Sequence, residues 1–161
     1  MIKVHGVMLD ITNLRNAEYT IGTPLEDAMM RDLTINSLFF NVNESKVEDF
    51  TGKGFPDLMA GRIQTPSDPV WTFKYDAVQL LRAIRFSSRF QFEIDPQILE
   101  AASDEEVRRC IISKVSRERI GKELDKIFEG NHPEASAALL QDLDLLKLLY
   151  KIPDNAVELQ D

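Results

Sequence analysis

The sequence predicts an α+β protein whose strands are confined to about the first 66 residues and whose remainder is helical. Alternating apolar and polar residues, with turn signals between them, occur in the first part. After residue 71, capping residues repeatedly precede apolar residues at helical spacing. The segment PSDPVW at 66–71 lies between the two patterns and contains two prolines, so it is the expected linker.

The first part is expected to contain three short strands. In HGVMLDITNLR, at 5–15, Val7 and Leu9 alternate with other residues and would share one face of a strand. SKVEDF at 45–50 and RIQTP at 62–66 have the same short-strand character. Between these two, TGKGFPDLMAG combines turn residues with a sequence long enough for one helical turn.

One helix is expected within the first part. Thr23, Pro24 and Glu26 form the pattern of a capping box with proline at the first helical position. The helix would continue through EDAMMRDLTINSLFF until the asparagines at 41 and 43 end it.

The second part is expected to consist of helices that begin at capping residues. Asp95 precedes Pro96, and Ser116 precedes a helix that would end at Phe128, before Gly130. The expected helices cover 76–89, the residues after 95, 103–112 behind the capping box SDEE, 116–128, and 131–150, which Asn131 would cap and which would divide near 142–144.

Composition indicates a globular protein without a membrane span, a disulfide or a zinc site. There is no run of about 18 apolar residues, and the N-terminus resembles neither a secretory signal nor a transit peptide. Cys110 is the single cysteine, and with only His5 and His132 beside it a His/Cys zinc site is not expected. The net charge of −8 argues against a broad nucleic-acid-binding surface, so any such contact would come from a local basic patch.

The predicted helix at 76–89 carries such a patch. At helical spacing, Gln79, Arg82, Arg85 and Arg89 fall within an arc of roughly 120°, opposite the apolar residues. Guanidinium groups bind phosphates and base acceptors with two donors at once, so this face is suited to a nucleotide. On spacing alone, a surface helix that pairs with the acidic residues of the second half is the favoured explanation.

Two other charged groups have the same two interpretations. Arg31 and Asp32 are adjacent and could be an intrahelical surface pair. Arg117, Arg119 and Lys122 lie among glutamates and could be a solvated, self-paired face.

The order of these motifs resembles the class II tRNA nucleotidyltransferases, or CCA-adding enzymes, and their relatives the bacterial poly(A) polymerases. GTPLEDAMMRDLTINSLFFN at 22–41 is similar to the family's head motif, and VEDFTGKGFPDL followed by RIQTP is similar to the strand-turn-strand after it. YDAVQLLRAIRFSSRF at 75–90 and KVSRERIGKELDKIF at 114–128 are similar to the two neck motifs. The resemblance covers about residues 7–150, and the motifs VEDFTGKG and SRERIGKEL look more like the eukaryotic branch of the family.

The resemblance implies a division of the chain and an activity. Residues 1–66 would be the C-terminal part of a nucleotidyltransferase head sheet, 67–130 a helical, nucleotide-binding neck, and 131–161 the start of a helical body. The complete enzyme would add C, C and A to tRNA 3′ ends from CTP and ATP with Mg²⁺. Its expected location is intracellular, in the cytoplasm, nucleus or mitochondrion.

The resemblance also implies which residues bind the nucleotide. Asp76 and Gln79 take the places of residues that hydrogen-bond the incoming base, and Arg82 and Arg85 those of arginines that meet the nucleotide and its phosphates. By the same resemblance, Arg31 would lie near the sugar and triphosphate, and Asp32 would hold the local structure of that segment. Arg119 and Glu123 would support the pocket from the later neck helix.

Three residues depart from the family pattern. Tyr75 replaces an acidic residue, Gln79 replaces the base-reading arginine, and Met30 replaces an arginine of the head motif. An arginine offers five donors, whereas glutamine offers two donors and an acceptor, so selection of cytosine should weaken. Two of the changes also remove positive charge from the expected triphosphate site.

The metal-binding carboxylate pair of the family has no counterpart in the sequence, so no catalytic residue is assigned. Asp10 is the weak candidate for a supporting metal ligand. We therefore expect a fragment truncated at both ends that is inactive alone, with a complementing head fragment or a second copy as a candidate partner. The alternatives are a non-catalytic nucleotide- or RNA-binding remnant or subunit, and a helical interaction module without a nucleotide role.

Overall fold

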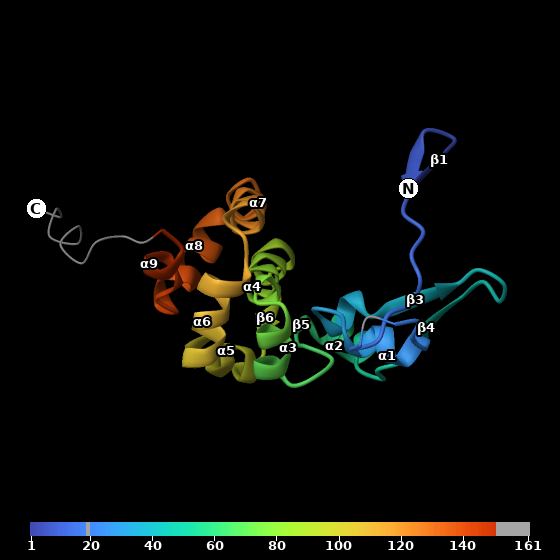
Figure 1. The fold of residues 1–161 in the computed structure, drawn as a ribbon, viewed down its shortest axis with the longest axis horizontal. Helices are drawn as coiled ribbons and strands as arrows, with labels where there is room; N and C mark the ends of the chain where they lie inside the picture. Colours follow the sequence, from blue (N-terminus) through green and yellow to red (C-terminus); the bar gives the residue numbers. More distant parts are fainter. Residues whose placement is uncertain (19, 151–161) are drawn as a thin grey trace, which may run out of the picture.

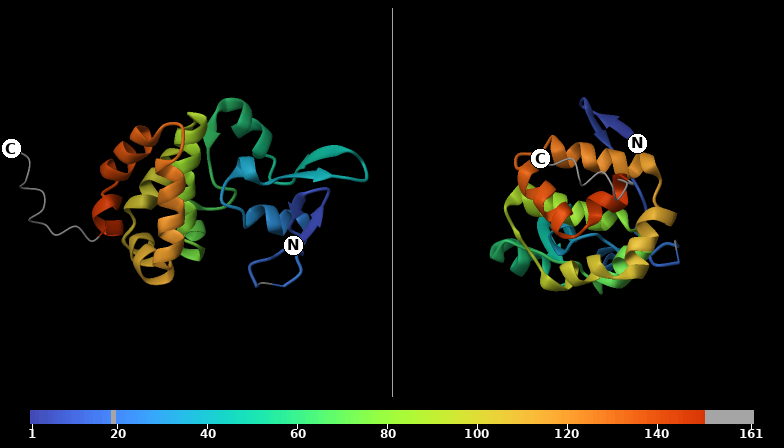
Figure 2. Two further views of the ribbon diagram at one scale, coloured as in Figure 1. Left: turned by 90° about the horizontal axis from the view of Figure 1, so that it is seen from above. Right: turned by 90° about the vertical axis from the view of Figure 1, so that its left-hand side faces the viewer.

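A strand-containing part and a helical part lie end to end in the computed structural model, which describes residues 1–18 and 20–150 (Figure 1). This arrangement confirms the expected α+β class. The first part contains two antiparallel hairpins and short helices; the second is helical, with one pair of two-residue strands. The same division is visible from above in the left view of Figure 2.

The first part has short elements joined by tight turns. Strands β1 and β2 form one antiparallel hairpin with Ile2 opposite Leu9, and β3 and β4 form another with Leu38 opposite Asp49. The elements are β1 (Ile2–Val4), β2 (Val7–Leu9), α1 (Pro24–Met29), the 3₁₀ helix η1 (Thr34–Asn36), β3 (Leu38–Asn41), β4 (Lys46–Asp49) and α2 (Gly54–Ala60).

The β1–β2 hairpin corrects the expected strand at 5–15. Only Val7–Leu9 of that segment is a strand, because His5 and Gly6 have φ angles of 48° and 85° and form the turn. Positive φ at both central residues is the geometry of a tight two-residue hairpin turn, and glycine reaches it without strain. The hairpin stands away from the helical part (Figure 1).

The helix expected from Thr23 to about residue 41 is wrong in its length. Thr23 does cap α1 through a complete capping box with Glu26, but the helix ends at Met29. The segment after it is fixed by buried side chains instead: Thr34 Oγ1 donates to Asp57 Oδ2 at 2.7 Å. Leu38–Asn41 then pairs with β4, so tertiary contacts prevail over the local helical pattern.

The second part is built around one long helix. Its elements are β5 (Arg62–Ile63), α3 (Pro69–Tyr75), α4 (Val78–Phe90), β6 (Glu93–Ile94), α5 (Pro96–Ser103), α6 (Glu105–Lys114), α7 (Arg117–Phe128), α8 (Pro133–Asp142) and α9 (Leu145–Tyr150). Helix α4 packs against both α7 and α8, and β5 pairs in parallel with β6 beside it. Leu80, Leu81 and Ile84 of α4 are fully buried at the centre of the core.

Leu33, from the segment after α1, belongs to the same apolar cluster as Ile63 of β5 and the α4 residues. The strand-containing part is therefore joined to the helical part by shared packing as well as by the chain. This shared packing holds the residues after α1 against α4.

The helix starts were predicted with mixed success. The side chains of Asp95 and Ser116 cap α5 and α7 as expected, and the division before α9 is confirmed. The linker expected at 66–71 is wrong, because Asp68 caps α3 and Pro69 is its first residue. Helix α6 is capped by Asp104 rather than Ser103, and α8 starts after His132 without a side-chain cap from Asn131.

The expected domain boundaries at 66/67 and 130/131 stay predictions, and the end of the third segment, 151–161, lies outside the described residues.

Candidate functional site

A cleft of about 660 Å³ lies where the end of α1 faces α4 and α7. Its walls come from segments far apart in the sequence, held together by the packing of α4. The lining residues are Arg15, Met30, Arg31, Asp32 and Asn36 from the first part, Asp76, Val78, Gln79, Arg82 and Phe86 on and before α4, and Arg119, Lys122, Glu123 and Lys126 from α7.

The cleft is basic although the protein is acidic. Six of its lining side chains are arginine or lysine and three are carboxylates, whereas the whole chain has a net charge of −8. A concentration of cations in a concave, partly desolvated site attracts anionic ligands. Hydrogen bonds from arginine to phosphate oxygens are among the stronger polar contacts in proteins.

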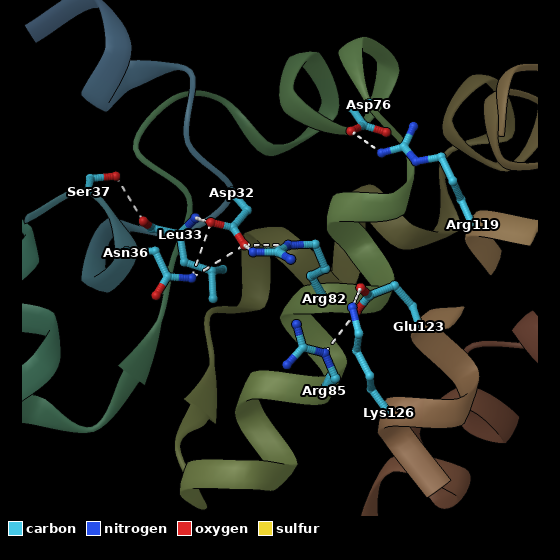
Figure 3. Close-up of polar contacts among 10 residues, drawn as sticks. All are labelled: Asp32, Leu33, Asn36, Ser37, Asp76, Arg82, Arg85, Arg119, Glu123 and Lys126. Atoms are coloured by element: carbon cyan, nitrogen blue, oxygen red, sulfur yellow. Dashed lines mark hydrogen bonds and ion pairs between the residues drawn. The ribbon is translucent and has the colours of Figure 1, made fainter. Parts of the chain in front are cut away.

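Asp32 and Arg82 form the bridge between the two walls (Figure 3). Nε and Nη2 of Arg82 each lie 2.7 Å from Oδ2 of Asp32, whose side chain is 7% exposed. Asp32 also accepts from the backbone N–H of Leu33 and from Nδ2 of Asn36. These bonds fix the carboxylate, and the carboxylate in turn orients the guanidinium toward the cleft.

Asp76 and Arg119 form a second pair across the cleft. Nη2 of Arg119 donates to Oδ2 of Asp76 at 2.7 Å (Figure 3). Asp76 ends α3 and precedes α4, and the N-cap Ser116 fixes the start of the helix that carries Arg119. Because Arg119 is half exposed and only Nη2 is engaged in this contact, its remaining N–H groups are available to a ligand.

Glu123 joins α4 to α7 near the floor of the cleft. Its Oε2 accepts from Nε of Arg85 at 2.8 Å, and its Oε1 accepts from Nζ of Lys126 at 2.7 Å. Burial acts to raise the pKa of Glu123, but the hydrogen bonds from Lys126 and Arg85 outweigh it and hold the pKa below its ordinary value. The carboxylate therefore stays charged and keeps both cations in place.

Arg31 has a carboxylate partner on its own side of the cleft. Its Nε donates to Oδ2 of Asp27 at 2.8 Å, and its guanidinium carbon lies 5.3 Å from the centre of the Phe39 ring. Asp27 also accepts from the backbone N–H of Arg15, which holds that segment at the rim. The side chain of Arg31 remains 42% exposed and lines the cleft.

Gln79 lies on the α4 face that lines the cleft, and its Oε1 is one of the few buried side-chain atoms without a hydrogen-bond partner among the described residues. The two ends of an amide side chain can exchange places by rotation. Gln79 can therefore present either donors or an acceptor to a ligand in the cleft.

The cleft brings together most of the residues predicted from sequence: Arg31, Asp32, Asp76, Gln79, Arg82, Arg119 and Glu123. Arg85 is not among its lining residues. It contacts Glu123 and lines an adjacent hollow on the other side of that ion pair. The nucleotide-binding roles of these residues stay predictions.

Asp10 does not line the cleft either. Its side chain is 73% exposed and lies 3.8 Å from the N-terminal amine. Across residues 1–18 and 20–150 there is no group of three or more His, Cys, Asp or Glu side chains placed to hold a metal ion. The metal role of Asp10 stays a prediction without a ligand set around it.

Several cleft residues escaped the sequence analysis as ligand-binding candidates. Lys122 and Lys126 follow Arg119 at intervals of three and four on α7, which is a readable signal that all three share one face. Phe86 is an apolar residue on the arginine face of α4, and helical spacing alone gives it no ligand-binding role. Arg15 and Asn36 carried no signal, because their positions depend on the turns around α1.

None of the helices in the described part of the chain is long and apolar enough to span a membrane.

Two family models match the chain. One, described as the poly A polymerase head domain, matches residues 1–64, and the other, described as a probable RNA and SrmB-binding site of polymerase A, matches residues 91–156.

Curated relatives are similar over most of this chain. A mitochondrial CCA tRNA nucleotidyltransferase of Saccharomyces cerevisiae is 41% identical over 157 residues, 92% of this chain and 29% of that protein. The mitochondrial CCA tRNA nucleotidyltransferase of Candida glabrata is 41% identical over the same share of this chain and 30% of its own length. The chain thus spans less than a third of the length of these relatives.

Solved structures share the fold. A CCA-adding enzyme in complex with ATP superposes with a TM-score of 0.67 at 28% identity, over 78% of this chain and 30% of that one. The Thermotoga maritima CCA-adding enzyme complexed with tRNA superposes with a TM-score of 0.68 at 28% identity, over 80% and 31%.

Proposed function

Because the chain belongs to the family of tRNA nucleotidyltransferases and poly(A) polymerases, we propose that it forms the nucleotide-binding part of a CCA-adding enzyme. The complete enzyme adds C, C and A to the 3′ end of tRNA from CTP and ATP. The observation that carries the proposal is the basic cleft, in which Arg31, Arg82 and Arg119 approach from three different segments.

The arginines of the cleft would hold the triphosphate. Arg82 is oriented by the buried carboxylate of Asp32, and Arg31 by Asp27, so both guanidinium groups are placed before a ligand arrives. A preorganised group loses less side-chain entropy on binding than a free one. The cations of α7, Lys122 and Lys126, line the opposite wall and add to the attraction for phosphate oxygens.

The base would be read at the start of α4. Cytosine and adenine both offer an exocyclic amino group next to a ring nitrogen acceptor. The carboxylate of Asp76 suits the amino group, and the amide of Gln79 can donate to the ring nitrogen. Glutamine donates less strongly than the charged guanidinium of other family members, so weak discrimination against uracil and guanine is expected.

The names of similar proteins support these substrates. Solved relatives include CCA-adding enzymes in complex with ATP and with CTP, and one complexed with tRNA. The proposed partner is accordingly the 3′ end of a tRNA, and an intracellular location, such as the mitochondrion named for the yeast relatives, follows from that partner.

Mg²⁺ would supply charge neutralisation for nucleotidyl transfer when bound. Among residues 1–18 and 20–150, no group of three or more His, Cys, Asp or Glu side chains is placed to hold a metal ion. We therefore assign none of the residues of this chain to it, and the contribution proposed here is to bind and orient the nucleotide.

Titration calorimetry of the purified chain with CTP and ATP tests the proposal. Both nucleotides should bind. Arg82→Ala should lower both affinities about tenfold or more, because hydrogen bonds from a charged donor are lost. Arg109→Ala, which removes an exposed arginine outside the cleft on α6, should leave both affinities unchanged. Failure of the unaltered chain to bind either nucleotide would overturn the proposal.

A non-catalytic nucleotide- or RNA-binding subunit is the second candidate, and Gln79 and Met30 favour it. Both lie in the cleft, at positions where the family pattern has arginine. The chain is incubated with labelled CTP, Mg²⁺ and tRNA lacking its CCA end. Incorporation of label would exclude this candidate, whereas binding without incorporation is expected of both candidates.

A further inference from the structure

The cleft-facing side of α4 continues past the nucleotide-binding residues as a row of arginines and phenylalanines. Phe86 lies in the cleft, and Arg82 and Arg85 have their guanidinium carbons 5.6 Å and 4.3 Å from the centre of its ring. One turn further on, the guanidinium of Arg89 lies 5.3 Å from the centre of the Phe90 ring. The row therefore repeats one unit, a cation over an aromatic ring, from the cleft to the end of the helix.

The aromatic rings of the row are stacked on one another. The centres of Phe86 and Phe90 are 5.7 Å apart in a stacked arrangement, and those of Phe90 and Phe92 are 5.5 Å apart. Phe90 is 42% exposed, although phenylalanine is usually buried. Phe90 thus exposes an aromatic surface at the end of the row of stacked rings that starts with Phe86 in the cleft.

A second hollow of about 530 Å³ accompanies the row along α7. Arg85, Arg89 and Lys126 line it, with Glu129 as the single acidic lining residue. Lys126 lines both this hollow and the cleft, so the two adjoin each other. In the described part of the chain no carboxylate is paired with Arg89, whereas Arg82, Arg85 and Arg119 each have one.

A charged groove beside stacked aromatic rings, of which Phe90 is exposed, has the features of a single-stranded nucleic-acid site. Cationic side chains follow the phosphates while bases stack on the rings, with little dependence on sequence. A protein partner would not need a row of cations, and a free mononucleotide would not need a track that leaves the cleft. The row suits the unpaired end of a polynucleotide whose terminal residue enters the cleft.

We propose that Arg89 and Phe90, with the hollow between α4 and α7, bind the single-stranded 3′ end of the RNA primer just before it enters the nucleotide cleft. Arg89 would contact a phosphate, and Phe90 would stack under an unpaired base. The proposal rests on the proposed function, since the cleft is where the incoming nucleotide would meet this primer. It adds a separate site for the second substrate of the same reaction.

The test measures the affinity of the full chain for a fluorescently labelled single-stranded RNA of about eight nucleotides by anisotropy at low salt. Phe90→Leu keeps apolar packing against Phe92 but removes the aromatic face, and should weaken RNA binding about fivefold or more. Arg89→Ala should weaken it comparably and reduce the salt dependence of the affinity, because one phosphate contact is lost. Phe90→Tyr should bind as the unaltered chain does.

Two matched controls separate a local role from a general loss of structure or charge. Phe128→Leu changes a phenylalanine of equal exposure, 42%, on α7 outside both hollows, and should leave RNA affinity unchanged. Arg109→Ala removes the same charge from α6 and should also have no effect. Equal losses in the controls, or undiminished RNA affinity in Phe90→Leu and Arg89→Ala, would overturn the proposal.

Nucleotide binding distinguishes this proposal from the proposed function. CTP affinity should be the same in Phe90→Leu, Arg89→Ala and the unaltered chain. A chain that binds CTP but not the RNA would overturn the primer site alone. A chain that binds neither would overturn both.

Discussion

Nε and Nη2 of Arg82 each lie 2.7 Å from Oδ2 of Asp32, although the two residues are 50 positions apart in the sequence. The pair joins the segment after α1 to the centre of α4, and the carboxylate is almost fully buried. The arginine of this pair is also the central cation of the cleft. The same contact therefore connects the stability of the fold with the shape of the binding site.

Asp32→Asn should destabilise the protein by about 3 kcal/mol, the low end for breaking a buried ion pair. The neutral amide cannot compensate the guanidinium, and its N–H₂ group can point at Arg82. In a thermal melt this corresponds to a decrease in Tm of roughly 6 to 12 °C for a chain of this size. Asp142→Asn, an exposed change on α8, is the control; an equal Tm for both variants would contradict the structural role of the pair.

Gln79→Arg should raise the affinity for CTP and ATP by about tenfold, since it replaces a neutral donor with a charged one near the expected base edge. The affinity for inorganic tripolyphosphate, which has no base, should change much less. Calorimetry with the three ligands checks the prediction. Equal gains for all three would mean that residue 79 acts on the phosphates through charge alone.

Met30→Arg should have the complementary effect. Met30 lines the cleft as the C-cap residue that follows α1, where an arginine is compatible with its helical backbone angles and with the helix dipole. The added cation should raise the affinities for CTP, ATP and tripolyphosphate several-fold and to a similar extent. The gain should shrink as salt is raised from about 0.05 to 0.5 M, because screening weakens exposed charges. A gain confined to one nucleotide would contradict a role in phosphate binding.

Glu123→Gln should destabilise the protein at neutral pH and much less in acid. The folded-state pKa of Glu123 is lowered, so its stabilisation is fully present above the ordinary value of about 4.3 and is lost as pH falls through the folded pKa. The difference in free energy of unfolding between the variant and the unaltered chain should be largest near pH 7 and shrink below about pH 4.

Urea denaturation at several pH values measures that difference. Glu118 lies on the same helix but is 75% exposed, so Glu118→Gln should change the free energy of unfolding by less than about 0.5 kcal/mol at every pH. A Glu123→Gln penalty that stays constant down to pH 3 would show that lost packing, rather than lost charge, is responsible.

Local capping patterns were the most reliable signals in the sequence. Thr23, Asp95 and Ser116 cap helices as expected, because a cap depends on residues only two or three positions away. The same signal was present at Asp68 and Pro69 but was interpreted as a linker. Proline breaks a helix only in its interior, and at the first position it costs no hydrogen bond.

Elements fixed by distant contacts could not be read from sequence. Leu38–Asn41 continues a helical pattern, yet it is held as β3 by its pairing with β4 and by the close approach of Gly54. A Cβ on Gly54 would lie 2.7 Å from Leu38 Cδ2 and 2.9 Å from the carbonyl oxygen of Thr34. That approach depends on the turn after β4, which brings α2 against η1.

The candidate site was partly readable because helical spacing places residues on faces. Arg82 and Gln79 were expected to share a face of α4, and they share the cleft. Spacing could not show that Arg85, on the edge of that face, turns toward Glu123 and into the adjoining hollow. The direction of an edge residue is decided by which carboxylate lies across from it on the neighbouring helix.

Arg31, Arg82 and Arg119 of the cleft each hold a carboxylate, so an incoming anion has to share these guanidinium groups rather than enter an empty electropositive site. A singly charged ion such as acetate or chloride gains from Arg82 or Arg119 little more than Asp32 or Asp76 already provides. A triphosphate brings several charges and can engage the basic side chains of both walls together. In the proposed site, the internal carboxylates would therefore favour polyvalent ligands over monovalent anions.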